Sequence, residues 1–352
     1  MPEMPVTPDR PSLPAWWARR PPAAGAAVMA TGIISIGLHL IGHETVSRIA
    51  LVLAVIAWLA LAADFVLRLV RDRERWRREA GTPPGLTAVA ATTVLGTRLS
   101  LLGWQGLAEA LLALAALLWP FLLVAVARNL RRGHMPGGVF LMCVATQGLA
   151  VLGSTIATAL GCEWLTHAAL VLFWLGIVLY GVAFAHFDLW QVARGAGDQW
   201  VAGGALAISA LAGSKLVAAH EVNPYLWNSD DQGVLRVATG VLLALDLAWY
   251  CVLFVAEAVW PRPHYDVRRW ATVFPMGMTA VATLMTATAL DTAPGLHTTG
   301  QVLLWIAVAT WLVVAAAAIV DARATARSAR LGSTRPGSGR LRSGRLRSRG
   351  PR

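Results

Sequence analysis

Hydroxyl side chains recur at helical spacing inside five apolar segments of this chain. In one segment Thr93, Thr97 and Ser100 are four and three residues apart, so they share one face of a helix. Hydroxyl groups donate hydrogen bonds without carrying charge, so a stripe of them can bind an anion weakly along a path through the protein. The candidate lining residues are Thr31, Ser35, Thr93, Thr97, Ser100, Gln147, Ser154, Ser209, Thr279 and Thr283.

The same hydroxyls also have a structural interpretation. In a membrane helix, Ser and Thr bond the carbonyl four residues earlier and allow neighbouring helices to pack closely. For any one residue this interpretation is favoured. For five segments together, with the segments between them nearly free of such residues, we favour a lined path.

Three basic side chains, His39, Arg98 and Lys215, lie toward one end of the same segments, and Lys215 is the only lysine of the chain. A cation at that depth costs about 2.5–3.5 kcal/mol on insertion scales, so it should face water, an anion or an acidic partner. A path with these residues at its entrance attracts anions and repels cations. Alternatively, Arg98 and Lys215 extend to the lipid headgroups, and the sequence leaves both interpretations open.

Phe274 and Pro275 lie near the start of another of these segments. Proline removes a backbone hydrogen bond and displaces a carbonyl, so we expect a kink near Phe274. A bulky aromatic residue beside a kink is a candidate gate for a narrow path. The alternative is that Phe274 packs against a neighbouring helix, since on an ideal helical wheel it lies well off the face of Thr279 and Thr283.

The remaining reactive residues form no catalytic or metal-binding pattern. Cys143, Cys162 and Cys251 lack metal-ligand spacing, and no pairing of Ser or Cys with His is apparent. We therefore expect no enzyme activity, no metal and no cofactor. Asp246 lies deep in an apolar segment without a partner in its own helix, so it could bond across helices or bind a proton.

Ten apolar segments of about 20 residues position these side chains. With 57% hydrophobic residues and a mean hydropathy of +0.58, the chain is predicted to be an all-α polytopic membrane protein. The odd-numbered segments hold 32 Gly, Ser and Thr residues, and the even-numbered ones hold 7. We predict ten transmembrane helices as five hairpins, with odd helices lining a central pore and even helices outside. The segments are 23–42, 49–70, 84–103, 107–127, 138–160, 165–187, 200–219, 234–257, 270–290 and 300–320.

Arginine is concentrated in one set of connections, which includes both ends of the chain, whereas the opposite set holds only Arg48 and Arg236. By the positive-inside rule, both termini are predicted to lie in the cytoplasm. The membrane is expected to be the plasma membrane. We predict a cytoplasmic tail at 1–20, a transmembrane domain at 21–322 and an Arg-rich disordered tail at 323–352. This last tail is expected to meet anionic lipid headgroups, not nucleic acid, or to have no specific role.

Four stretches resemble the tellurite-resistance/dicarboxylate-transporter family, which includes plant slow-type anion channels and fungal malate and sulfite transporters. They are AVMATGIIS at 27–35, ATQGLA at 145–150, GALAISALAG at 204–213 and WATVFPMG at 270–277. The resemblance covers roughly residues 20 to 320. It implies five hairpins around a pore, a homotrimer with one pore per subunit and a phenylalanine gate, a role that would fall on Phe274. Ala30 departs from the glycine common at that position.

These observations predict transmembrane passage of a small anion: a C4-dicarboxylate such as malate or succinate, sulfite, tellurite, chloride or nitrate. A proton-coupled dicarboxylate carrier is the main alternative, because a channel and a carrier differ in whether a second gate closes behind the ion. A membrane sensor or scaffold that docks partners through the Arg-rich tail ranks lower.

Overall fold

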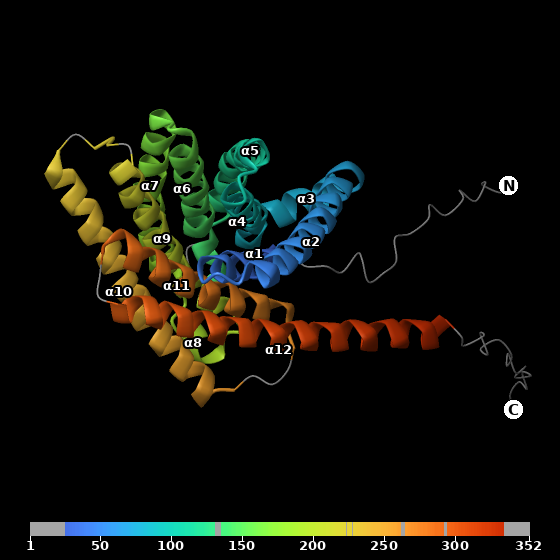
Figure 1. Cartoon of the computed structure of the whole chain (residues 1–352). Helices are drawn as coiled ribbons and strands as arrows, with labels where there is room; N and C mark the ends of the chain where they lie inside the picture. The colour runs from blue at the N-terminus through green and yellow to red at the C-terminus, as the bar shows by residue number, and fades with distance from the viewer. Residues whose placement is uncertain are drawn as a thin grey trace, which may run out of the picture.

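The structure is a computed structural model that describes residues 25–130, 135–222, 224–226, 228–261, 265–291 and 294–333. Within these ranges the chain is mostly helical (Figure 1). The helices are α1 (Gly25–Leu40), α2 (Glu44–Arg71), α3 (Arg73–Ala80), α4 (Thr87–Leu101), α5 (Gln105–Asn129), α6 (Leu141–Leu160), α7 (Glu163–His186), α8 (Gln191–Arg194), α9 (Val201–Val222), α10 (Ser229–Val259), α11 (Trp270–Ala289) and α12 (Pro294–Ser333).

Each of the ten predicted apolar segments overlaps one long helix. Eight of these helices, α2, α5, α6, α7, α9, α10, α11 and α12, are long and apolar enough to cross a membrane. The other two, α1 with 16 residues and α4 with 15, fall short of the length of a full span. The protein is thus a multi-pass α-helical membrane protein, and the total of ten spans stays a prediction.

Five helices close a ring in the middle of the molecule. In order around the ring, α1 contacts α4, α4 contacts α6, α6 contacts α9, α9 contacts α11, and α11 contacts α1 again. Almost all residues of these helices are buried. Small residues allow the close packing: a Cβ added to Gly204 of α9 would lie 2.9 Å from Cγ of Pro275 in α11.

Each ring helix is followed in the chain by a helix that packs against it from outside: α2, α5, α7, α10 and α12. Figure 1 shows α2, α10 and α12 at the edges of the molecule. Most residues of these outer helices are not buried, and large apolar side chains such as Phe121, Val171 and Val313 are exposed. A surface of this kind is stable against lipid and not against water.

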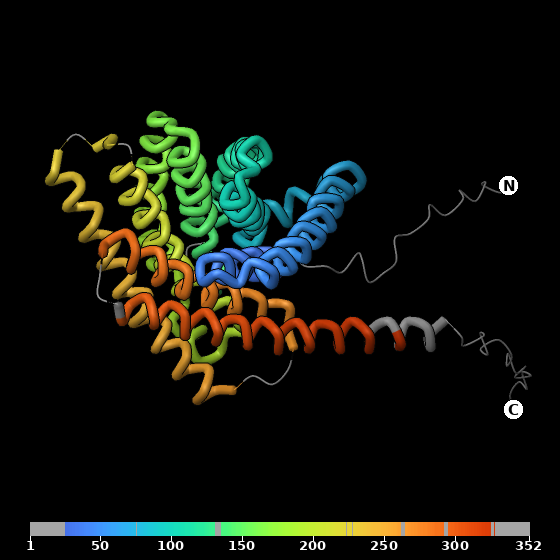
Figure 2. Tube along the Cα trace, viewed as in Figure 1, coloured from blue at the N-terminus to red at the C-terminus, as the bar shows by residue number. Residues whose placement is uncertain are grey.

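Two features differ from the sequence prediction. Helix α3 (RERWRREA) is too polar to be found by hydropathy. Helix α12, the long tube across the lower part of Figure 2, continues to Ser333, so residues 323–333 are helical where disorder is predicted. Alanine and arginine, which recur there, favour helix strongly. The rest of this tail, and the predicted N-terminal tail at 1–20, lie outside the described residues.

Candidate functional site

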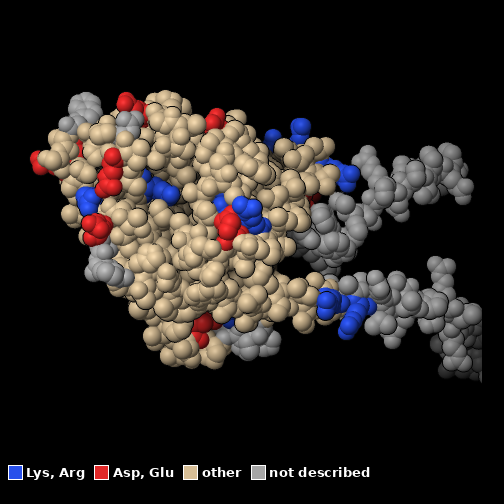
Figure 3. All heavy atoms as spheres, in the orientation of Figure 1, with Lys and Arg blue, Asp and Glu red and all other residues tan. Residues whose placement is uncertain are grey.

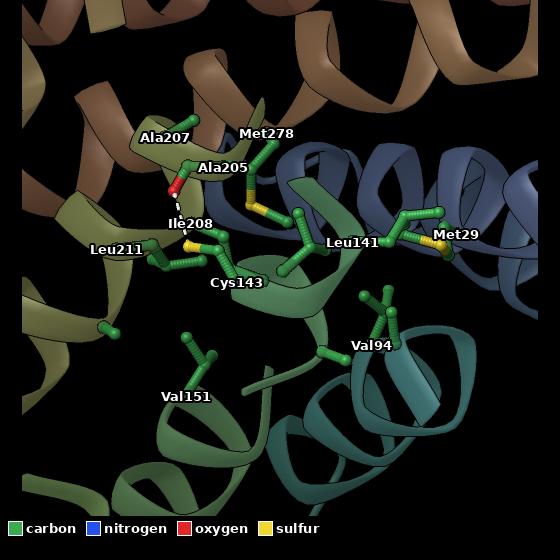
Figure 4. Packing of buried hydrophobic residues seen from close by; sticks show 14 of the residues in the cluster. Met29, Val94, Leu141, Cys143, Val151, Ala205, Ala207, Ile208, Leu211 and Met278 are labelled. Carbon is green, nitrogen blue, oxygen red and sulfur yellow. Dashed lines mark hydrogen bonds between the residues drawn. The ribbon is translucent and has the colours of Figure 1, made fainter. Parts of the chain in front are cut away.

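A small cavity of about 20 Å³ lies inside the ring, and all five ring helices contribute to its wall. That volume has room for about one water molecule. The wall is mostly apolar, and Figure 4 shows part of it, including Val94, Val151, Leu211 and Met278. We refer to this space as the central cavity.

Three polar side chains line the central cavity: Thr93, Thr97 and Lys215. Thr93 donates its hydroxyl proton to the carbonyl of Ala90 at 2.9 Å, and Thr97 donates to the carbonyl of Thr93 at 2.8 Å. Both hydroxyl protons therefore serve the helix backbone and are not free for an anion. Lys215 is partly buried, and its ammonium has no hydrogen-bond or ion-pair partner among the described residues.

The other predicted lining residues lie outside the wall of the central cavity, and three of them bond residues of outer helices. These bonds join Thr31 Oγ1 and Trp311 Nε1 (3.0 Å), Gln147 Nε2 and the Phe173 carbonyl (3.0 Å), and Thr279 Oγ1 and Asp246 Oδ1 (3.1 Å). These three side chains, which the sequence predicts to face a path, thus bond the ring helices to the outer helices. For these residues the structure favours the packing interpretation.

Four more of these residues bond groups within or next to their own helices. Ser100 donates to Gln105, and the other three donate to nearby backbone carbonyls: Ser154, Ser209 and Thr283. The physical reason is that a buried hydroxyl must donate somewhere, and the carbonyl three or four residues earlier is always within reach.

Arg98 is fully buried, and its guanidinium faces α1 and α2, not the central cavity. Its Nε atom lies 3.2 Å from Oγ of both Ser35 and Ser47, and its Nη2 atom donates to Glu44 Oε1 at 3.0 Å. Ser35 and Ser47 also donate to each other's backbone carbonyls, which cross-links α1 and α2. Ser35 therefore does not line the central cavity, and Arg98 does not extend to the headgroups.

Glu44, which the sequence analysis missed, sits at the centre of this group. Its carboxylate also lies 2.7 Å from His39 Nδ1 and 2.8 Å from Arg48 Nε. Two of the three predicted anion-attracting residues, His39 and Arg98, are thus matched by one internal acid. A sequence signal for Glu44 exists, because an acid four residues before an arginine at the start of an apolar segment suggests a local ion pair.

Phe274 and Pro275 lie near the start of α11, which continues through the proline as one helix. Gly204 and Pro275 are in contact near the starts of α9 and α11, and Lys215 and Met285 line the central cavity near the ends of these helices. The two helices are therefore parallel, and Phe274 lies toward the end of the ring away from Lys215. The Phe274 side chain is buried and is not part of the cavity wall.

Asp246 of α10 is fully buried behind α11. Its Oδ1 atom accepts the bond from Thr279, so the carboxyl group bonds across helices, one of the two interpretations that the sequence left open. Its Oδ2 atom is buried and has no hydrogen-bond partner among the described residues.

A closed ring of small-residue helices is covered by apolar helices and surrounds a narrow central cavity. The cavity wall includes a lysine that has no partner among the described residues, and this arrangement suits a membrane protein that transports anions. The family model described as voltage-dependent anion channel, SLAC1, matches residues 19–319, and the chain belongs to this family, the one that the four stretches resemble. Its members are channels and transporters of anions and not enzymes. Among curated proteins, none matches the chain.

Proposed function

We propose that small anions cross the membrane along the axis of the ring, past Lys215, through a path that Phe274 and Pro275 close toward its other end. Lys215 carries this proposal. It lines a cavity to which all five ring helices contribute, and no acidic side chain among the described residues pairs with it. A cation in that position lowers the barrier for an anion and raises it for a cation.

The apolar wall supports a path that is closed at rest. Apart from Lys215, the narrow section offers no free hydrogen-bond donor, so it holds little water, and an ion enters it only when the helices move apart. Weak binding by one ammonium group also lets an anion leave as readily as it enters. We propose as substrates the C4-dicarboxylates malate and succinate, or sulfite, tellurite, chloride or nitrate.

The arrangement in the membrane is part of the same proposal. Arginine placement supports an even number of spans, both termini in the cytoplasm and insertion in the cell membrane. The ten helices that match the ten apolar segments support ten spans in five hairpins. The homotrimer rests on the family resemblance.

We expect Lys215→Gln to lower anion flux into proteoliposomes by roughly tenfold. An ammonium 4 Å from an anion contributes about 4 kcal/mol at an effective dielectric constant of 20, and dehydration of the ion offsets most of it. Flux of chloride, nitrate, sulfite, malate and succinate is measured with wild type and variant. The matched control is Arg236→Gln, which removes a cation that lies outside the cavity wall and pairs with Glu221. Equal flux in both variants would refute the role of Lys215.

The proton-coupled carrier is kept as a second candidate because of Asp246. A buried carboxyl group with one unbonded oxygen in a membrane helix is the type of residue that binds protons in coupled carriers. If the protein is a carrier, a proton gradient drives malate uptake by wild type and Asp246→Asn abolishes that effect. If the protein is a channel, malate moves down the malate gradient alone. In that case wild type and Asp246→Asn respond in the same way to an imposed pH gradient.

A further inference from the structure

A second, larger cavity of about 350 Å³ lies between α2, α3, α4 and α5. In Figure 2 the short helix α3 lies between α2 and α5, and it contacts both. Apolar side chains such as Leu61, Phe65 and Leu118 form most of the wall, and Leu114 at its edge is 39% exposed. We call this space the α2–α3 cavity.

The end of the α2–α3 cavity next to α3 is polar. Arg68 bonds Asp64 of its own helix at 2.8 Å and Glu79 at 2.6 Å, and the second ion pair joins α2 to α3. Both carboxylates are therefore already matched by a cation. Trp76 also lines this end, and its Nε1 atom is buried and has no hydrogen-bond partner among the described residues. An indole N–H in this position needs an acceptor that the described part of the chain does not supply.

The surface beside this polar end carries more exposed arginines than acids, the acids being Asp72 and Glu74. Arg71 at the end of α2 and Arg73, Arg77 and Arg78 of α3 are all exposed. Figure 3 shows basic side chains gathered at this edge of the molecule. A short basic helix that follows a membrane span lies at the membrane surface, where each such arginine attracts anionic headgroups.

We propose that the α2–α3 cavity binds one acyl chain of an anionic glycerophospholipid, with the phosphate beside the arginines of α3 and an ester carbonyl accepting from Trp76. Three observations support it: an apolar cavity between an outer helix pair and α4, a buried unused donor at the polar end of that cavity, and an excess of arginine over acid on the surface beside it. The binding site is separate from the central cavity, although α4 contributes to both, and it does not rest on the proposed transport path.

The test is native mass spectrometry of the full chain, purified in detergent and incubated with equal amounts of dioleoylphosphatidylglycerol and dioleoylphosphatidylcholine, which share their acyl chains. Wild type is expected to retain one phosphatidylglycerol. Ala62→Phe fills the cavity and abolishes this adduct. The matched control is Ala63→Phe, at the next residue, which is exposed and outside the wall, and which keeps the adduct.

A second pair of variants keeps the test valid if Ala62→Phe fails to fold. Arg71→Gln and Arg77→Gln are each expected to lower the preference for phosphatidylglycerol about fivefold. Arg48→Gln, at the opposite end of α2, is expected to leave it unchanged. Equal retention of the two lipids in wild type would overturn the proposal, as would an adduct that survives in a folded Ala62→Phe variant. An oligomer that dissociates in Ala62→Phe would overturn it too, since the cavity would then be a contact between copies of the chain.

Discussion

At the scale of single residues, buried polar side chains of this protein mostly bond one another or the backbone. In Arg98 a guanidinium with no exposed surface is held through its Nε and Nη2 atoms by two serines and Glu44, while Nη1 has no partner among the described residues. Burying a charge is tolerated only with such partners. Lys215 has no partner of this kind among the described residues, and this contrast is the reason why we propose it as the residue that an anion meets.

We predict that Glu44→Gln lowers the free energy of unfolding by about 2 kcal/mol, since it leaves the buried Arg98 guanidinium without its counter-charge. The value lies below that of a fully buried pair, because the Glu44 side chain is one-third exposed. The measurement is thermal unfolding in detergent. Arg48→Gln is the control, and it should cost less than about 0.5 kcal/mol, because that partner is exposed. A similar loss of stability in both variants would show that the Arg98–Glu44 pair contributes no more to stability than the exposed Arg48–Glu44 pair.

At the scale of helices, glycines set the spacing of the ring. Gly204 lies against Pro275, and a Cβ there would approach three atoms of the proline to between 2.9 and 3.2 Å. Gly153 of α6 is also buried, yet a Cβ there would meet its nearest neighbour at an ordinary 3.7 Å. Gly204 therefore allows α9 and α11 to touch, whereas the space beside Gly153 can accept a methyl group.

Gly204→Ala is expected to lower the stability of the protein by about 1–3 kcal/mol, because α9 and α11 must move apart. Gly153→Ala should leave it unchanged or raise it by up to about 1 kcal/mol, since alanine favours helix over glycine. Melting temperatures in detergent distinguish the two. Should Gly204→Ala melt at or above the wild-type temperature, the contact between α9 and Pro275 would not be tight in solution.

The alternation of small-residue and Leu-rich segments identified every helix of the ring, because close packing and lipid contact demand different side chains. The alternation could not reveal α3, because the arginines of this helix give it a low hydropathy. Of the predicted lining hydroxyls, only Thr93 and Thr97 lie in the wall of the central cavity. In α9 and α11 the cavity is lined by stripes such as Ile208, Leu211 and Lys215, while Ser209 and Thr279 point elsewhere. Helical spacing finds residues that share a face, and only the packed structure shows which face points inward.

At the scale of the whole molecule, the ring helices and the outer helices have different surroundings. The outer helices face lipid, and the ring surrounds a central cavity whose wall is apolar except for two threonines and one lysine. Such a ring conducts only if its helices, or a side chain between them, move. Phe274, a large and fully buried side chain near the start of α11, is the candidate for that movement.

The most direct test compares anion flux into proteoliposomes for wild type, Phe274→Ala and Phe173→Ala. Phe173 is equally buried but belongs to α7, outside the ring, so its loss destabilises the protein without opening a path. We predict that Phe274→Ala raises the flux of chloride, nitrate and malate by at least about tenfold, as the loss of a barrier of about 1.4 kcal/mol would, and that Phe173→Ala leaves the flux per folded protein unchanged. Wild-type flux that neither substitution alters would contradict the account, because the anions would then cross by a route that Phe274 does not close.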